Sequence, residues 1–153
     1  MKNGCLWLNG GPWRLARAAE GMPSGERLSQ ADLDDSQWLR ATVPGTVLTS
    51  YVNLGAVPNP IYSDDNLQIS ESYFSNASFW YRRAFTMPKE WAGKRVFLNL
   101  DGINWKANVF LNGQRVGRLE GAFMRGQFDI TQALQTGQNV LAIEIEPNAH
   151  FGA

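Results

Sequence analysis

Alternating apolar and polar residues dominate the chain from about residue 79 onward. Successive side chains of a strand point to opposite faces, so a period of two predicts half-buried β-strands. We expect such strands over residues 79–87, 96–100, 105–111, around 116, 127–130 and 141–145. No helical pattern separates them, which indicates an antiparallel β-sandwich and not alternating strand–helix units.

Turn signals support this interpretation, while the first half of the chain is less regular. Asn112-Gly113 predicts a tight hairpin, because both central residues of a type I′ turn need a positive φ. Trp13 lies on an expected early strand, and Thr46 is expected to cap a short helix that Gly55 closes. Residues 34–38 predict a single helical turn or a loop anchored by its tryptophan.

Residues 56–78 are expected to form one long loop, with prolines at its start and Asp64-Asp65-Asn66 at its polar centre. Loops of this length in a compact domain are more often functional than idle. The sequence therefore directs attention to this segment.

The length of 153 residues predicts one domain, spanning residues 1–153. A domain of this size buries about 70% of its unfolded surface, so its core needs neither disulfides nor metal. Aromatic residues make up 12% of the chain, and packing between sheets is the default use of so many rings.

Charge and residue counts exclude several classes of function. The 14 basic and 14 acidic side chains balance, which argues against a nucleic-acid partner, and no apolar run of 18 residues predicts a membrane span. The single Cys5 and His150 cannot form a Cys/His zinc site or a disulfide framework, and no acidic cluster requires calcium. We expect no cofactor and no metal. Residues 1–10 contain no apolar core of a signal peptide, which leaves localisation open and export of a parent protein possible.

Paired carboxylates are the remaining candidates for catalysis, because two neighbouring carboxyl groups can divide the roles of acid and base when their environments separate their pKa values. Asp34-Asp35 and Asp64-Asp65 are adjacent, but neighbouring side chains diverge in extended or turn backbone. Neither pair is flanked by apolar residues that would raise one pKa. Solvated loop or capping residues are the expected interpretation, and we expect no catalytic residue in this chain.

Several segments in a fixed order resemble a known family. They are Val43-Pro44-Gly45-Thr46, Pro60-Ile61-Tyr62-Ser63-Asp64, Trp80-Tyr81-Arg82-Arg83-Ala84-Phe85, Val109-Phe110-Leu111-Asn112-Gly113 and Phe128-Asp129-Ile130-Thr131. Together they resemble the N-terminal sugar-binding domain of glycoside hydrolase family 2, which includes β-galactosidases, β-mannosidases, β-glucuronidases and exo-β-glucosaminidases. The resemblance covers roughly residues 7–147.

The resemblance implies a jelly-roll β-sandwich of the galactose-binding type, followed in the family by an immunoglobulin-like domain and a (β/α)8 barrel. Both catalytic glutamates of the family lie in the barrel, so this chain alone is expected to be inactive. In the family, a loop of this form reaches the mouth of the barrel and binds the terminal sugar of a β-linked glycan. By this resemblance the sugar-binding role falls on Asp64, with Asp65 and Asn66 as alternatives and Tyr62 beside them.

Three functional hypotheses remain open. The first is an accessory domain that closes the active-site pocket of a retaining exo-β-glycosidase, similar to a β-mannosidase or an exo-glucosaminidase. The second is an independent carbohydrate-binding module or lectin-like domain, and the third is a purely structural interaction domain. Trp105, Tyr62 and Phe123 lie near expected turns, where an exposed ring can stack on a pyranose or anchor a loop.

Overall fold

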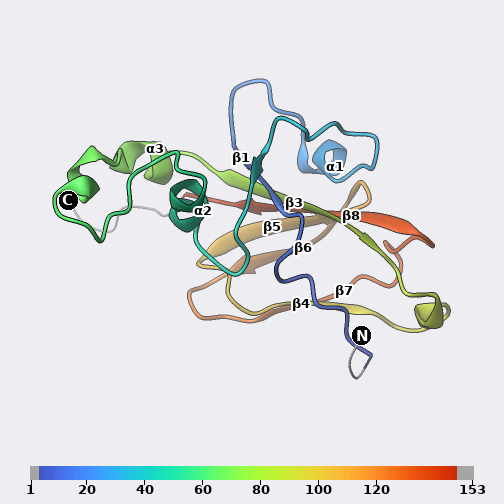
Figure 1. Ribbon diagram of the computed structural model, residues 1–153. Helices are drawn as coiled ribbons and strands as arrows, with labels where there is room; N and C mark the ends of the chain where they lie inside the picture. Colours follow the sequence, from blue (N-terminus) through green and yellow to red (C-terminus); the bar gives the residue numbers. More distant parts are fainter. Residues whose placement is uncertain (1–3, 148–153) are drawn as a thin grey trace.

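The computed structural model describes residues 4–147 as a β-sandwich of two unequal antiparallel sheets (Figure 1). The larger sheet has six strands in the order β2-β1-β3-β8-β5-β6, and β4 pairs with β7 in the smaller one. The strands are β1 (Arg14–Arg17), β2 (Leu39–Arg40), β3 (Phe79–Thr86), β4 (Phe97–Leu100), β5 (Lys106–Leu111), β6 (Gln114–Glu120), β7 (Gly126–Asp129) and β8 (Gln138–Ile145). The expected all-β antiparallel fold is confirmed.

The main core lies between the two sheets, where the period of two places the apolar residues. Leu15, Val109 and Leu141 of the large sheet are completely or almost completely buried there. Leu98 and Phe128 of the small sheet pack against the same cluster. The aromatic-rich sequence is used mainly for packing, as expected.

The outer face of the large sheet carries a second core that the sequence pattern does not predict. The short helix α1 (Gly25–Leu28) lies over this face (Figure 1), and Leu28 packs with Trp80, Phe110 and Ala142. A Cβ atom added at Gly25 would lie 2.4 Å from the Phe110 ring. Only glycine therefore lets the helix backbone approach the sheet so closely.

Residues 34–38 form turns and no helix, and they help to hold α1 in place. Arg82 of β3 is buried, donates to the carbonyl oxygens of Leu28 and Gln30, and pairs with Asp35. The expectation that Asp35 is a solvated loop residue is wrong, because its carboxylate neutralises a buried guanidinium.

Local turn and cap predictions agree with the structure. Asn112 and Gly113 have φ values of 49° and 84° between β5 and β6, as the hairpin prediction requires. The helix α2 (Val47–Asn53) begins after Thr46, whose side chain accepts a hydrogen bond from the Thr49 amide at 3.0 Å. Gly55, with φ of 69°, follows its end.

The segment 56–78 is less irregular than expected. It contains a 3₁₀ turn, η1 (Asp65–Gln68), and a short helix, α3 (Glu71–Ser75), which Ser70 caps by accepting from the Tyr73 amide. Five residues are too few to show a helical period in the sequence. A further 3₁₀ turn, η2 (Lys89–Trp91), lies between β3 and β4.

Candidate functional site

The base of the segment 56–78 is fixed to the sandwich by aromatic packing. Tyr73 and Phe74 of α3 contact Tyr51 of α2 and Phe79 of β3, with ring centroids between 5.1 and 6.4 Å apart. The Tyr51 and Tyr73 hydroxyls lie 3.1 Å apart. Burial, followed by this hydrogen bond, raises the pKa of Tyr51 above its ordinary value. The Tyr51 phenol therefore stays neutral and hydrogen-bonded to the Tyr73 hydroxyl at neutral pH.

Arg17 of β1 also binds the base of this segment. Its Nε donates to the Tyr73 carbonyl oxygen at 3.0 Å, and its guanidinium carbon lies 4.6 Å from the centroid of the Tyr73 ring. Both contacts fix α3 and thereby the direction in which the preceding residues leave the sandwich.

The tip of the segment, residues 59–68, projects from this base and is held by local hydrogen bonds. Asn59 accepts from the Ile61 and Tyr62 amides, the Asp65 amide donates to the Tyr62 carbonyl, and the Leu67 amide donates to the Asp64 carbonyl. Ser63 has φ of 49°, which turns the chain sharply just before Asp64. The tip is therefore a defined turn on a rigid support.

The four residues expected to bind substrate lie together at this tip, though not in equivalent environments. Asp64 occupies the cap position of η1 but uses its backbone and not its side chain there. Its exposed carboxylate has no hydrogen-bond or ion-pair partner among residues 4–147. The Asp65 carboxylate accepts from the side-chain amide nitrogen of Gln68 at 3.2 Å. Asn66 is exposed, and the Tyr62 ring is mostly exposed. Asp64 is therefore a solvated loop residue, and its side chain does not cap η1.

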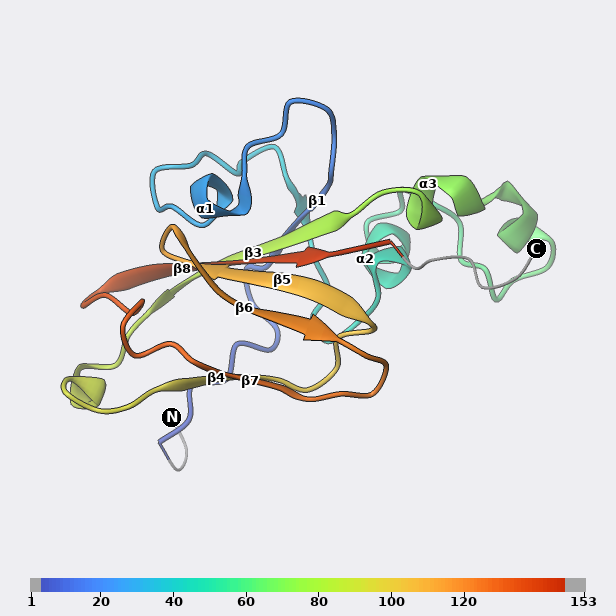
Figure 2. The ribbon, with the colours of Figure 1, turned by 180° about the vertical axis from the view of Figure 1, so that it is seen from behind.

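The other two aromatic candidates lie at the same end of the sandwich. The register aligns Phe79, Ile145, Ala107 and Leu119 across the large sheet. The connections 101–105 and 121–125 therefore emerge beside the start of β3, and both ribbon views place them at the end that carries segment 56–78 (Figures 1 and 2). We call this end, formed by segments 56–78, 101–105 and 121–125, the loop end.

These aromatic residues differ in exposure. Trp105 is half-buried, and the Lys106 ammonium lies 4.8 Å from its ring centroid. Phe123 is fully exposed and has φ of 60°. Nothing in the sequence pattern distinguishes an exposed turn phenylalanine from a buried one.

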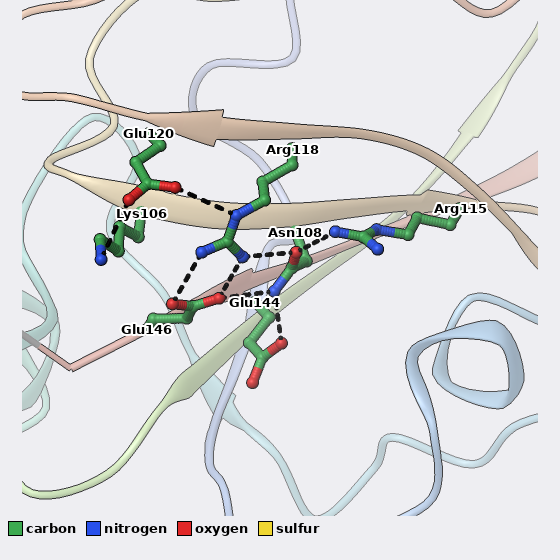
Figure 3. A network of polar contacts seen from close by, with 7 residues as sticks. All are labelled: Lys106, Asn108, Arg115, Arg118, Glu120, Glu144 and Glu146. Atoms are coloured by element: carbon green, nitrogen blue, oxygen red, sulfur yellow. Dashed lines mark hydrogen bonds and ion pairs between the residues drawn. The ribbon is translucent and has the colours of Figure 1, made fainter.

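A network of carboxylates and arginines occupies the outer face of the large sheet, beyond the part that α1 covers (Figure 3). Asn108 of β5 lies opposite Glu144 of β8 and Arg118 of β6. Its amide nitrogen donates to Glu144 and Glu146 at 3.0 and 2.9 Å, and its amide oxygen accepts from Arg115 and Arg118 at 2.7 and 2.9 Å. All four hydrogen-bonding positions of the amide are used.

The ion pairs of this network lower the pKa of two of its carboxyl groups. Hydrogen bonding to Arg118 lowers the pKa of Glu146, and hydrogen bonding to Lys106 lowers that of Glu120. A glycosidase acid needs a raised pKa, so both shifts have the wrong direction for a catalytic acid. Among the described residues no three His, Cys, Asp or Glu side chains are grouped to hold a metal ion. His150 lies outside the described residues, and Cys5 is exposed.

Two hollows in the surface lie away from segment 56–78. One, of about 470 Å³, is at the opposite end of the sandwich, where Trp91, Lys94, Thr131 and Gln132 are among its lining residues. The other, of about 300 Å³, lies beside Arg82 and Asp35. Within residues 4–147, no helix has both the length and the apolar character needed to cross a membrane.

Comparison with known proteins relates this fold and loop to one family. The family described as "Glycosyl hydrolase 2 galactose-binding domain-like" matches residues 27–153. The mannosylglycoprotein endo-β-mannosidase of Lilium longiflorum is 34% identical over 92% of this chain, and an exo-β-D-glucosaminidase of Streptomyces avermitilis is 33% identical over 74% of it. This chain covers only 15% and 12% of their respective lengths.

A solved structure agrees with these matches. The exo-chitosanase CsxA of Amycolatopsis orientalis superimposes with a TM-score of 0.81 at 26% identity, over 90% of this chain and 16% of that one. The galactose-binding-like sandwich expected from the sequence is thus confirmed, and its relatives are much larger enzymes. The chain belongs to glycoside hydrolase family 2, as a galactose-binding-like domain of that family.

Proposed function

We propose that this chain is the accessory domain of a retaining exo-β-glycosidase and closes the active-site pocket of a barrel in the same polypeptide. The observation that carries the proposal is the Asp64 carboxylate, which has no partner within residues 4–147 and lies at the tip of a rigidly supported loop. Vicinal hydroxyls of a terminal sugar are suitable donors to such a carboxylate, and charge-assisted hydrogen bonds are the stronger kind. A β-linked mannoside or glucosaminide is the proposed substrate class, in keeping with the glucosaminidase and mannosidase relatives.

The support of the loop adds to this proposal. Tyr73 and Arg17 fix its base, so the backbone that carries Asp64 is held in position before substrate arrives. A pre-positioned group loses little conformational entropy on binding. The pocket would be blind at this end, which favours release of single sugars from a chain terminus.

Asp64→Ala in the full-length enzyme tests the sugar-binding role. We expect kcat/KM for a p-nitrophenyl β-mannoside or β-glucosaminide to fall about 10- to 100-fold, since hydrogen bonds to a charged group contribute about 1.5–3 kcal/mol. Glu90→Ala, a similar change at the opposite end of the domain, is the control and should leave kcat/KM unaltered. Unchanged kinetics in Asp64→Ala would remove Asp64 from substrate binding.

An independent carbohydrate-binding module is the second candidate, and the hollow of about 470 Å³ at the opposite end favours it. An indole beside hydroxyl, amide and ammonium groups is a combination suited to a sugar. Titration calorimetry of this chain with mannose, glucosamine and their oligomers separates the candidates. Millimolar or tighter binding that Trp91→Ala abolishes would support the module, whereas absence of heat supports the docked accessory domain.

A further inference from the structure

The hollow of about 470 Å³ at the end opposite the loop end has the size and position of a ligand site. It lies between the β3–β4 connection, residues 87–96, and the β7–β8 connection, residues 130–137. Both ribbon views place η2, in the first of these connections, at the end of the sandwich away from α3 (Figures 1 and 2). Small-molecule sites typically have volumes of about 300–1,000 Å³. We call this feature the distal hollow.

Hydrogen bonds between the two connections hold the distal hollow in shape. The Met87 amide donates to the Gly137 carbonyl oxygen at 2.9 Å, which joins the connections beside the large sheet. The Val96 amide donates to the Thr131 hydroxyl at 2.9 Å and joins them again beside the small sheet. Because both connections are fixed before any ligand arrives, binding costs little ordering of the protein.

The charge of the lining favours an anionic ligand. The lining contains two cations, Lys94 and Arg95, and no aspartate or glutamate. Arg95 is paired with Asp129 outside the hollow, at 2.8 Å. The Lys94 ammonium is exposed and has no ion-pair partner within residues 4–147. It is therefore available for a charge-assisted hydrogen bond to an anion.

The remaining side chains favour a sugar over a simple anion. Trp91 is half-buried and packs against the main core, so its indole is held in place at the hollow. Gln132 and Thr136 are exposed, and their side chains form no hydrogen bond within the described part of the chain. An apolar ring face beside free amide and hydroxyl groups matches a pyranose, which has an apolar C–H face and hydroxyls at its edge.

We infer that the distal hollow binds a glycan that carries an anionic group, with this group on Lys94 and a sugar ring against Trp91. A carboxylate and a sulfate present the same chemistry to an ammonium, so either can supply the charge. The site goes beyond the proposed function, because it lies at the other end of the sandwich from Asp64. It also differs in ligand from the second candidate function, since mannose and glucosamine carry no negative charge.

Titration calorimetry of the full-length protein tests this site. The ligand is trigalacturonate, and its fully methyl-esterified form is the matched uncharged control. Their α-linkages are not substrates of a β-glycosidase. In 0.15 M salt we expect millimolar or tighter binding of trigalacturonate and binding of the ester that is weaker by about five-fold or more. A sulfated carrageenan oligosaccharide in a third titration distinguishes sulfate from carboxylate as the preferred group.

Two variants locate the binding. Lys94→Gln should weaken trigalacturonate binding by about five-fold or more and remove the preference for the acid over the ester. Lys89→Gln is the matched control, because Lys89 is an exposed lysine of η2 that does not line the hollow. Its effect should stay below about two-fold, since salt at 0.15 M largely screens exposed charges that are more than about 8 Å apart.

Several results would overturn the assignment. They are absence of binding by both the carboxylated and the sulfated oligosaccharide, equal affinity for the acid and its ester, and unaltered binding in Lys94→Gln. Displacement of trigalacturonate by an equal concentration of inorganic sulfate would reduce the site to one for a simple anion and remove the glycan.

The outcomes separate this site from the proposed function. A lower kcat/KM in Asp64→Ala without any binding of the anionic oligosaccharides would keep the sugar-binding role of the loop and remove the distal site. Unaltered kinetics in Asp64→Ala with trigalacturonate binding that depends on Lys94 would do the reverse.

Discussion

The two halves of the outer face of the large sheet are built by opposite means. Under α1, Phe110 and Trp80 form an apolar core, and the buried Arg82 is neutralised by Asp35. Asn108 lies two residues before Phe110 on β5 and forms hydrogen bonds with carboxylate and guanidinium groups that are partly exposed to water (Figure 3). The strand β5 thus contributes to both halves. The stability of the covered half depends on apolar packing, and that of the open half depends on charged hydrogen bonds.

Removal of packing from the covered half should have the largest effect. Phe110→Ala leaves a cavity under α1 and should lower the free energy of unfolding by about 3–5 kcal/mol. Urea unfolding of this chain measures the change. Phe97→Ala on β4 is the exposed control and should stay within about 0.5 kcal/mol. Equal losses in the two variants would contradict a second core under α1.

The matched change on the open half should cost less. Asn108→Ala removes four hydrogen bonds, but water can replace most of them because the partner side chains are partly exposed. We expect a loss of about 1–2 kcal/mol in the free energy of unfolding. A loss as large as that of Phe110→Ala would show that the network is as important to the fold as the core.

The smallest effect should be the dependence of stability on pH that the open half contributes. The pKa of Glu146 is lowered from 4.5 by Arg118, so this contribution is fully present above pH 4.5 and is lost as the pH falls through the lowered value. Arg118→Gln should therefore lose more stability relative to the original protein at pH 6 than at pH 2, where the loss of the hydrogen bond from Arg118 to Asn108 remains. Unfolding curves at both pH values, repeated in 1 M salt, measure the difference. A constant difference across pH would disprove the ionic origin.

Much of the sandwich follows from the sequence, and the missing parts have physical reasons. The strands between residues 79 and 145 alternate because one face of each is buried against the core. The same alternation assigns Arg82 to the outer face correctly but gives no sign of its burial, because the residues that cover it are 47 to 54 positions away. The helix α1 has four residues, too few to produce a period.

The position of the candidate site along the chain was predictable, whereas the contacts that anchor it were not. The proline-bounded segment with Asp64 at its centre indicates an exposed polar turn, and the structure has one. Its anchor combines α2, β1 and β3, and no local signal connects Arg17 with Tyr73. The exposure of Phe123 likewise depends on a turn that places the ring outside the sandwich.

The local bonding of the tip has a consequence for how this domain can be modified. Within the described part of the chain, the hydrogen bonds of residues 59–69 join positions no more than four apart, whereas the base depends on contacts with distant strands. Residues 59–68 thus form a locally bonded unit whose two ends are fixed to the sandwich. We expect that a tip of different sequence can be grafted between the same end points without rebuilding the sandwich.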